Sequence, residues 1–262
     1  MLDRITPIVL TYNEAPNIGR ALEKLNWAKD ILVIDSFSND ETLSIVKQYP
    51  QARVLQRKFD NFGDQRNFAL DKGEIKTDWV IFMDADYILT DELIEEMRML
   101  TATSDIIGYR VHFIYCIYGR PLRSTVYPPL VSLFKKDCGR YIADGHTQIL
   151  KIKGKTTNLK SPILHDDHKS LDRWMASQDH YAKLEAIKLI ETPQKNLSFV
   201  DRVRSMIVIA PFVMFWYCLV VKRLFFDGRI GWQYTFQRVF SEWALSLYLL
   251  QHRMGKLAPK IN

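Results

Sequence analysis

Short apolar runs alternate with helical patterns over roughly the first 100 residues of the chain. Continuous apolar runs at 5–11, 31–34 and 79–83 predict buried strands, and 53–56 predicts a weaker one. Between these runs, apolar residues recur every three or four positions, which predicts helices. Continuous apolar strands separated by helices are typical of a Rossmann-like, mainly parallel sheet with helices on both faces. The pattern therefore predicts an α/β fold that binds ligands beyond the carboxyl ends of its strands.

The chain keeps this globular character up to residue 198. Residues 104–165 are rich in aromatic residues, Gly and Pro, which predicts mixed β structure with loops. An apolar stripe over 170–192 predicts a long helix. Because no repeat or low-complexity linker interrupts these patterns, we interpret residues 1–198 as one domain.

Residues 199–262 differ in character from the rest of the chain. Residues 206–221 are a run of sixteen uncharged residues, shorter than the ~20 apolar residues of a spanning helix. A second helix after Gly228 has a predicted apolar face and an opposite polar face. We expect a helical hairpin that lies in one membrane leaflet; a buried helix pair, packed on the domain or in a dimer, and a single span are the alternatives. The apolar positions are Trp232, Phe236, Phe240, Trp243, Leu247 and Leu250, and the polar positions are Gln233, Gln237, Arg238, Ser241 and Glu242.

The positive charge of the chain is concentrated in the same C-terminal region. The net charge is +6, and residues 199–262 contain nine Lys and Arg against three Asp and Glu, which accounts for the whole excess. Basic residues beside an apolar segment indicate an anionic membrane surface. A nucleic-acid partner is not expected, because the basic excess is not spread over the folded body and no zinc-finger or RNP motif is present.

The overall composition is that of an ordinary globular protein. Of the 262 residues, 47% are hydrophobic and 25% are charged, which excludes disorder, collagen and a disulfide scaffold. The three cysteines have no pairing or metal-binding spacing, which indicates a reducing compartment. Because no signal-peptide pattern opens the sequence, we expect the protein at the cytoplasmic face of the cell membrane, held by its C-terminal region.

An acidic pair, Asp84-Ala-Asp86, ends the apolar run at 79–83. Two carboxylates at a strand end would repel each other unless a cation lies between them, and the sequence places no lysine nearby to neutralise them. A hard divalent cation, Mg²⁺ or Mn²⁺, would satisfy both carboxylates and would also bind phosphate oxygens of a substrate. The alternative is an acidic surface turn without a ligand.

Two further segments carry candidate binding residues. Residues 63–67, Gly-Asp-Gln-Arg-Asn, open a predicted helix, where Arg66 and the helix N-terminus suit an anionic phosphate; a simple cap is the alternative. Asp35 ends the run at 31–34 and could accept hydrogen bonds from a base or a ribose, or could be a turn residue. No Gly-x-Gly-x-x-Gly or P-loop motif is present, so a dinucleotide site and a P-loop NTPase are not expected.

These motifs in this order resemble the inverting glycosyltransferases of family 2, which have the GT-A fold. The resemblance covers residues 4–100 closely. It is carried by Ile8-Val-Leu-Thr-Tyr-Asn-Glu14, Val33-Ile-Asp-Ser-Phe-Ser-Asn-Asp-Glu-Thr42, Gly63-Asp-Gln-Arg-Asn67 and Trp79-Val-Ile-Phe-Met-Asp-Ala-Asp86. The later segments 144–148 and 165–174 are similar to the subgroup of lipopolysaccharide-core β-glucosyltransferases.

The resemblance implies a set of donor-binding residues. Arg66 would lie near the diphosphate of a nucleotide sugar, and Asp84 and Asp86 would bind the ribose and the metal. Tyr87 departs from the family pattern, because relatives often carry a further acid there. The nucleoside would be held by Thr11, Asn13, Glu14 and Asp35.

The resemblance also implies a base that takes the proton of the acceptor hydroxyl. Many relatives use an acid in a His-Glu pair, and Thr147 stands where that Glu would be. We therefore predict Asp144 as the catalytic base, with Asp166 and Asp167 as a fallback pair that could equally cap the following helix. His146 is a candidate metal ligand or diphosphate donor, and His165 is its alternative.

Together these features predict a metal-dependent inverting glycosyltransferase. The resemblance implies a UDP-linked sugar as the donor, and the C-terminal region predicts a lipid-linked or lipopolysaccharide-core acceptor at the membrane. One alternative is a sugar nucleotidyltransferase, against which the missing Gly-rich loop after the first strand counts. The other is a non-enzymatic, nucleotide-binding membrane scaffold.

Overall fold

The computed structural model describes residues 1–101, 105–144 and 147–255 of the chain. Contacts divide these residues into two compact units. The boundary between the units falls near residue 170, whereas the sequence pattern placed it near residue 198. The first unit comprises Met1–Pro121, Tyr127–Ala143 and Thr147–Lys169, and the second comprises the remaining described residues.

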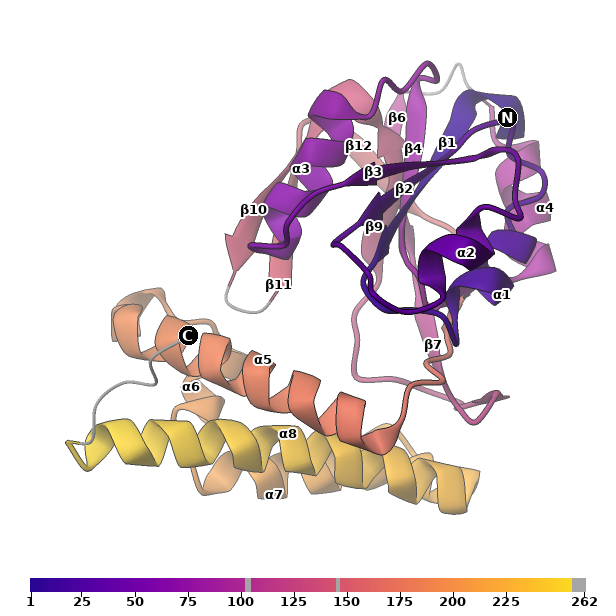
Figure 1. The fold of residues 1–262 in the computed structure, drawn as a ribbon. Coiled ribbons are helices and arrows are strands. Elements are labelled where there is room, and N and C mark those ends of the chain that lie inside the picture. The colour runs from indigo at the N-terminus through magenta and orange to yellow at the C-terminus, as the bar shows by residue number, and fades with distance from the viewer. Residues whose placement is uncertain (102–104, 145–146, 256–262) are drawn as a thin grey trace. The chain divides into compact units, whose positions relative to one another are not determined.

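A seven-stranded sheet forms the centre of the first unit, in the order β12-β6-β9-β4-β1-β2-β3 (Figure 1). β1 pairs in parallel with β2 and β4, and β2 pairs in parallel with β3. β9 runs antiparallel to β4 and β6. The predicted α/β fold with a mainly parallel sheet is confirmed. The strands are β1 (Ile5–Thr11), β2 (Ile31–Asp35), β3 (Ala52–Gln56), β4 (Trp79–Asp84), β6 (Ile106–Val111), β9 (Leu130–Lys135) and β12 (Lys155–Asn158).

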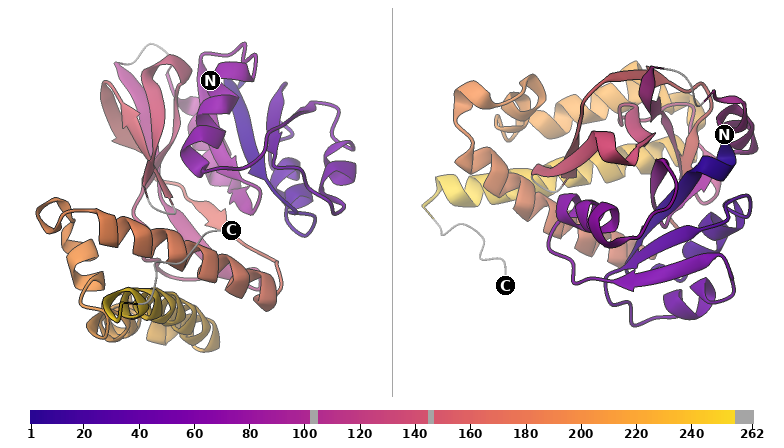
Figure 2. Two further views of the ribbon diagram at one scale, coloured as in Figure 1. Left: turned by 60° about the vertical axis from the view of Figure 1, so that its left-hand side comes forward. Right: turned by 90° about the horizontal axis from the view of Figure 1, so that it is seen from above.

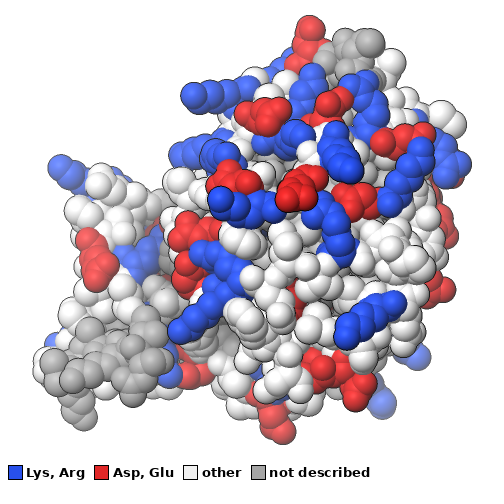
Figure 3. Space-filling model, turned by 45° about the horizontal axis from the view of Figure 1, so that its top comes forward, with Lys and Arg blue, Asp and Glu red and all other residues white. Residues whose placement is uncertain are grey.

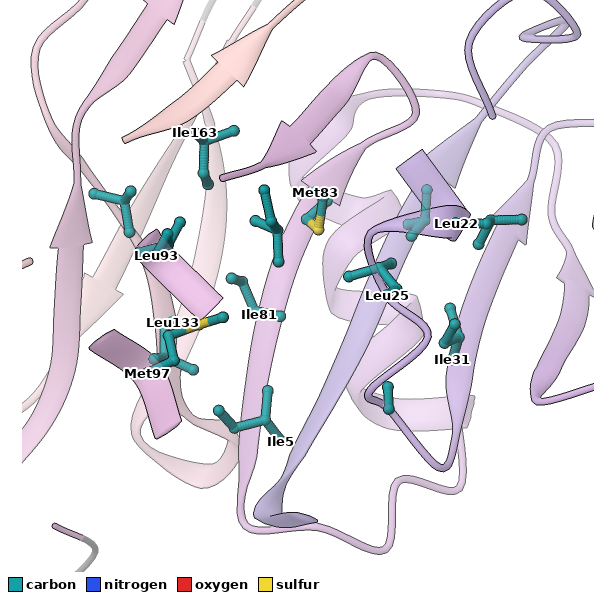
Figure 4. Close-up of a cluster of buried hydrophobic side chains, with 14 of the residues drawn as sticks. Ile5, Leu22, Leu25, Ile31, Ile81, Met83, Leu93, Met97, Leu133 and Ile163 are labelled. Atoms are coloured by element: carbon teal, nitrogen blue, oxygen red, sulfur yellow. The ribbon is translucent and has the colours of Figure 1, made fainter. Parts of the chain in front are cut away.

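Apolar clusters cover both faces of this sheet, because β1, β2 and β4 are buried almost throughout. On one face, α1 (Ile18–Glu23) and α4 (Asp91–Met99) contribute to a cluster around Ile81 (Figure 4). On the other face, α3 (Phe62–Lys72) contributes to a cluster around Phe82. Burial on both faces explains why these strands read as continuous rather than alternating apolar runs.

A smaller sheet brings a later segment of the chain to the end of β4. β13 (Ile163–His165) pairs antiparallel with β5 (Tyr87–Leu89), which follows the turn after β4, and parallel with β7 (Phe113–Ile117). Residues 165–169 therefore lie beside the acidic turn. The other elements of this unit are α2 (Thr42–Val46), β8 (Arg120–Pro121), β10 (Gly139–Asp144), β11 (Thr147–Ile152) and the 3-10 turns η1 (Leu2–Arg4) and η2 (Lys136–Cys138).

The second unit is helical, and α8 contacts both α5 and α7 (Figure 2). Its apolar core includes Ala186 of α5 and Leu245 of α8. Arg204 of α6 ties these helices together, because it pairs with Glu185 at 2.8 Å and with Glu242 at 3.1 Å. The elements are α5 (Leu171–Glu191), η3 (Gln194–Asn196), α6 (Phe199–Arg204), α7 (Ile209–Trp216), the π turn η4 (Tyr217–Val221), η5 (Leu224–Asp227) and α8 (Arg229–Arg253).

The apolar stripe of α8 faces outward, whereas the alternative of a buried helix pair would turn it toward the protein. Phe236 and Leu247 are 56% and 64% exposed, whereas Glu242, placed on the polar face, is only 6% exposed. Periodicity alone predicts the two faces of a helix but not which of them packs on the protein. The packed side of α8 combines Glu242, which pairs with Arg204, with Leu245 and Leu249 of the apolar core.

Exposed apolar side chains continue from α8 onto the neighbouring helix. Phe212 and Trp216 of α7 are 56% and 60% exposed, and Phe212 contacts Trp243 of α8. The second unit therefore carries one apolar surface, which we call the α7–α8 surface. It comprises Phe212, Trp216, Val220, Phe225, Phe226, Phe236, Phe240, Trp243 and Leu247. No helix in the described part of the chain combines the length and the apolarity needed to cross a membrane.

The distribution of charge differs from that of the apolar residues. On the face drawn in Figure 3, basic and acidic side chains are interspersed, and no large region carries only one sign.

Candidate active site

The carboxyl ends of three neighbouring parallel strands meet at one edge of the central sheet. Thr11 of β1 is in register with Asp35 of β2, and Leu10 is in register with Asp84 of β4. The backbone N–H of Ser36 donates to Thr11 O at 2.9 Å, so the loop after β2 is fixed to the end of β1. The structure therefore brings together three of the predicted donor-binding residues, Thr11, Asp35 and Asp84.

Asp35 is fully buried and organises the loop that follows it. Its carboxylate accepts hydrogen bonds from the hydroxyl and the backbone N–H of Ser38, at 2.5 and 3.0 Å, and from Gln56 Nε2 at 2.9 Å. Asn13 joins this loop, because its backbone N–H donates to Ser38 Oγ and its side-chain oxygen accepts from the N–H of Asn39. The next helix, α2, begins after this loop at Thr42.

Arg66 contacts Asp84, one of the two acids of the predicted metal site. Its Nη2 lies 2.8 Å from Asp84 Oδ1, and the Arg66 side chain is only 6% exposed. Three aromatic rings surround the guanidinium, with ring centroids 5.6 to 5.9 Å from its central carbon. The rings belong to Phe62, Phe82 and Tyr141. Arg66 was predicted beside a diphosphate, and this role stays a prediction: Nη2 pairs with Asp84, while the buried Nη1 has no hydrogen-bond partner among the described residues.

Asp86 is buried and has different partners from Asp84. Its Oδ2 lies 3.1 Å from His165 Nε2 and 3.8 Å from Lys169 Nζ. Burial alone would raise the pKa of Asp86, but the charge and hydrogen bond of His165 and the charge of Lys169 hold this pKa below its usual value. Burial likewise opposes protonation of His165, yet Asp86 raises the pKa of this imidazole.

The expectation that no lysine neutralises the acidic pair is therefore wrong. Lys169 is distant in sequence, but β13 carries its segment to the end of β4. Lys169 Nζ lies 2.6 Å from Glu14 Oε1 and 3.4 Å from Asp167 Oδ2. Burial and the charge of Asp86 raise the pKa of Glu14 to about 7, although Lys169 opposes this shift. Glu14, predicted to hold the nucleoside, thus has its side chain in a buried ionic cluster.

Sequence reasoning assigned no role to Lys169. The residue lies in the segment 165–174 that carried part of the family resemblance, but its spacing from the acids gives no local signal. Only the pairing of β13 with β5 brings it to Asp86 and Glu14.

The fallback base residues Asp166 and Asp167 lie beside the acidic turn. The N–H of Asp166 donates to Asp86 O at 3.0 Å, and its side chain accepts from Arg20 at 2.6 Å and contacts His168 at 3.0 Å. The alternative that these acids cap the next helix is wrong, because Ser170 caps α5.

Asp144, the predicted base, ends β10 and belongs to the second unit. Its carboxylate lies 3.1 Å from Lys188 Nζ of α5. Asp144 therefore has a cationic partner, and its role as a base stays a prediction. His146 lies outside the described residues, so its predicted role as a metal ligand stays a prediction.

The acidic turn has the chemistry that a divalent cation requires. Asp86 Oδ1 is buried and has no hydrogen-bond partner in any other described residue, and the Asp84 side chain is 32% exposed. Carboxylate oxygens are the preferred ligands of Mg²⁺, which usually takes one or two of them together with substrate phosphates. No cluster of three or more His, Cys, Asp or Glu suited to a metal occurs among the described residues. Among the described residues, Asp84 and Asp86 are the carboxylates that would hold a metal at this turn.

The mainly parallel α/β sheet of the first unit has the GT-A-like arrangement. Residues 6–160, more than half of the chain, match the family model described as Glycosyl transferase family 2. The chain belongs to this family.

Several known proteins are similar to the chain over most of its length. An uncharacterized glycosyltransferase of Rickettsia bellii is 25% identical over 247 residues, which are 87% of this chain and 80% of that protein. The lipopolysaccharide core biosynthesis glycosyltransferase LpsC of Rhizobium meliloti is 26% identical over 73% of each chain. The crystal structure of S. aureus TarS 1-349 in complex with UDP-GlcNAc superposes with a TM-score of 0.49 at 15% identity, covering 98% of this chain and 93% of that one.

Proposed function

We propose that this family 2 glycosyltransferase is inverting and moves a sugar from a UDP-linked donor to a lipid-linked glycan of the lipopolysaccharide-core type. The observation that carries the donor assignment is the alignment of Thr11, Asp35 and Asp84 at neighbouring strand ends. The acceptor class is supported by the similarity to LpsC, whose name places it in lipopolysaccharide core biosynthesis.

Each strand-end residue has a part in donor binding. Asp35 is held by Ser38 and Gln56 and is fully buried, so a uracil N–H or a ribose hydroxyl would reach its carboxylate when the loop at Ser38 moves. Asp84, fixed by Arg66 and partly exposed, is available to a ribose or a metal. Asp86 offers its unpartnered Oδ1 to Mg²⁺ or Mn²⁺. The metal would neutralise charge on the departing nucleoside diphosphate.

The α7–α8 surface supports action at a membrane, which we propose is the cytoplasmic face of the cell membrane. Aromatic and aliphatic side chains point outward from this surface while Glu242 is buried. Lys222, Arg223 and Arg229 lie in the same stretch of chain, within the region that holds the positive excess. Exposed aromatic residues combined with basic ones suit an anionic bilayer. A bilayer of anionic phospholipids is the partner that this surface fits.

A thermal-shift experiment tests the donor assignment. We expect UDP and UDP-sugars to raise the melting temperature, and to raise it further with Mn²⁺, because a ligand of the folded state stabilises it by mass action. ADP, GDP and CMP serve as matched nucleotides that should shift the melting temperature less. If none of the UDP compounds shifts it at millimolar concentration, with or without metal, the donor assignment is wrong.

Product analysis separates the alternative functions. A glycosyltransferase releases UDP from a UDP-sugar, whereas a sugar nucleotidyltransferase consumes a nucleoside triphosphate and releases pyrophosphate. A non-enzymatic scaffold does neither, and Asp86→Asn would then leave every measurable property except ligand binding unchanged. UDP release that needs a lipid-linked acceptor and is lost in Asp86→Asn supports the proposal.

A further inference from the structure

Lys169 is the only side chain that the described structure places within 4 Å of carboxylates from three separate segments of the ionic cluster. Its Nζ lies 2.6 Å from Glu14 Oε1, 3.4 Å from Asp167 Oδ2 and 3.8 Å from Asp86 Oδ2. Glu14 follows β1, Asp86 follows β4 and Asp167 follows β13. The Lys169 side chain is only 17% exposed, so this is not a solvated surface charge.

The cluster around Lys169 is held in place by further hydrogen bonds. Asn17 Nδ2 donates to Glu14 Oε2 at 2.8 Å and to Asp167 Oδ1 at 3.0 Å, which joins two of the three acids. The backbone N–H of Lys169 donates to Asp167 Oδ1 at 3.0 Å. The position of the ammonium group is therefore fixed by the backbone and by its partners.

The two oxygens of the Asp86 carboxylate have different surroundings. His165 and Lys169 both lie on the side of Oδ2, while the buried Oδ1 has no hydrogen-bond partner in another described residue. An incoming divalent cation at Oδ1 would be attracted by the carboxylate and repelled by the nearby ammonium group. An incoming diphosphate would be attracted by the same ammonium group. Lys169 therefore repels the metal and attracts the diphosphate of a metal–diphosphate complex.

We propose that Lys169 is the resident counter-ion of the donor site: it weakens binding of the free divalent cation and strengthens binding of the diphosphate. The metal then enters efficiently only together with the nucleotide. Lys169 is a positioning and binding residue in this proposal and transfers no proton. The proposal rests on the proposed function, because it assumes that a diphosphate binds beside Asp86.

The variant Lys169→Met tests this, since it keeps the length of the side chain and removes its charge. Titration of Mn²⁺ without nucleotide, followed by electron paramagnetic resonance, should give binding on the order of tenfold tighter. Calorimetric titration of UDP in EDTA should give binding on the order of tenfold weaker. Tighter Mn²⁺ binding together with weaker UDP binding distinguishes this role from a merely structural one, because a structural role would weaken both affinities.

Two control variants complete the experiment. Lys169→Arg keeps the charge, so both affinities should stay within about threefold of wild type. Lys24→Met removes a lysine from the exposed ion pair with Asp91 and should change neither affinity. If Lys169→Met does not fold, Lys169→Met/Asp167→Asn removes one acid together with the lysine. This double variant should still bind UDP more weakly than Asp167→Asn alone.

The outcomes separate this proposal from the proposed function. Weaker or unchanged Mn²⁺ binding in a folded Lys169→Met protein overturns the counter-ion role, whatever UDP does in the wild type. Absence of UDP binding by the wild type, with or without Mn²⁺, overturns the donor assignment. Tighter Mn²⁺ binding in the variant would in that case still show that Lys169 opposes a cation at Asp86.

Discussion

Arg66 Nη2 lies 2.8 Å from Asp84 Oδ1, so a nearly buried guanidinium from α3 fixes a partly exposed carboxylate at the end of β4. The aromatic rings around Arg66 hold the guanidinium in one orientation. The Asp84 side chain is therefore already held in one rotamer when a ligand binds.

Arg66→Lys should weaken both folding and donor binding. The ammonium group keeps the charge but loses the planar group that the rings enclose. Because Asp84 is partly exposed, we expect the free energy of unfolding to fall by about 1–3 kcal/mol, below the cost of breaking a fully buried pair. Denaturant unfolding and UDP–Mn²⁺ titration measure the two effects. Arg4→Lys, at the exposed pair with Asp78, should change neither.

Asp86→Asn should abolish metal-dependent donor binding. The amide is isosteric but removes the charge on which both a metal and the ion pairs with His165 and Lys169 depend. We expect UDP release to fall by at least about 100-fold, while UDP binding without metal changes less. Asp78→Asn removes an exposed acid at the other end of β4 and serves as the control. Full activity of Asp86→Asn would remove this residue from the site.

Glu14 should make the stability of the protein depend on pH. Its pKa is raised from 4.5 to about 7, chiefly by burial, so folding takes up a proton between these values. Stability contributed by this group therefore falls as pH rises from about 4.5 to about 7 and is constant above that. One proton corresponds to a slope of at most ~1.4 kcal/mol per pH unit. Denaturant unfolding of Glu14→Gln should show a flatter profile over this range; an unchanged slope contradicts the shift.

The sequence allowed the strands and their functional ends to be predicted because both depend on local pattern. Runs buried on both faces are apolar throughout, and the polar residue that ends each run marks the carboxyl edge. Asp35 and Asp84 were therefore found without coordinates, and the family resemblance added Thr11. The partners of Asp86 could not be found this way, because His165 and Lys169 reach it only through the pairing of β13 with β5.

The C-terminal helix shows a second limit of pattern reading. Hydrophobic periodicity correctly separates Phe236 and Trp243 from Glu242 on α8, but it does not show which side packs on the protein. In the structure Glu242 is buried against Arg204. The burial of an acid on a helix can be predicted only when its basic partner is known. The partner of Glu242 is Arg204, which lies on α6.

The identity of the base is testable by comparing two acids. We predict that Asp144→Asn lowers kcat by about 100-fold or more with little change in UDP binding, as expected for loss of a general base. Asp167→Asn, which lies in the cluster around Lys169, should instead alter ligand affinity. Measurement of kcat and of UDP affinity for both variants distinguishes the roles. If only Asp167→Asn lowers kcat, the base is Asp167.

The α7–α8 surface should bind anionic bilayers through its outward aromatic residues. Trp216 and Trp243 are 60% and 41% exposed, and transfer of such side chains from water into the bilayer interface is favourable. The double variant Trp216→Asp/Trp243→Asp should bind vesicles of phosphatidylglycerol at least about tenfold more weakly in a co-sedimentation assay. Its melting temperature should change little, because neither side chain belongs to the buried core of this unit.

The matched control is Met99→Asp, which changes a 78% exposed apolar residue of the first unit. This variant should sediment with vesicles as the wild type does. Phosphatidylcholine vesicles, which lack net charge, should bind the wild type more weakly, because the basic residues of 199–262 then have no anionic partner. Equal sedimentation of the double variant and the wild type would show that the exposed aromatic residues serve another contact, such as one between two copies of the chain, which ultracentrifugation of the wild type would detect.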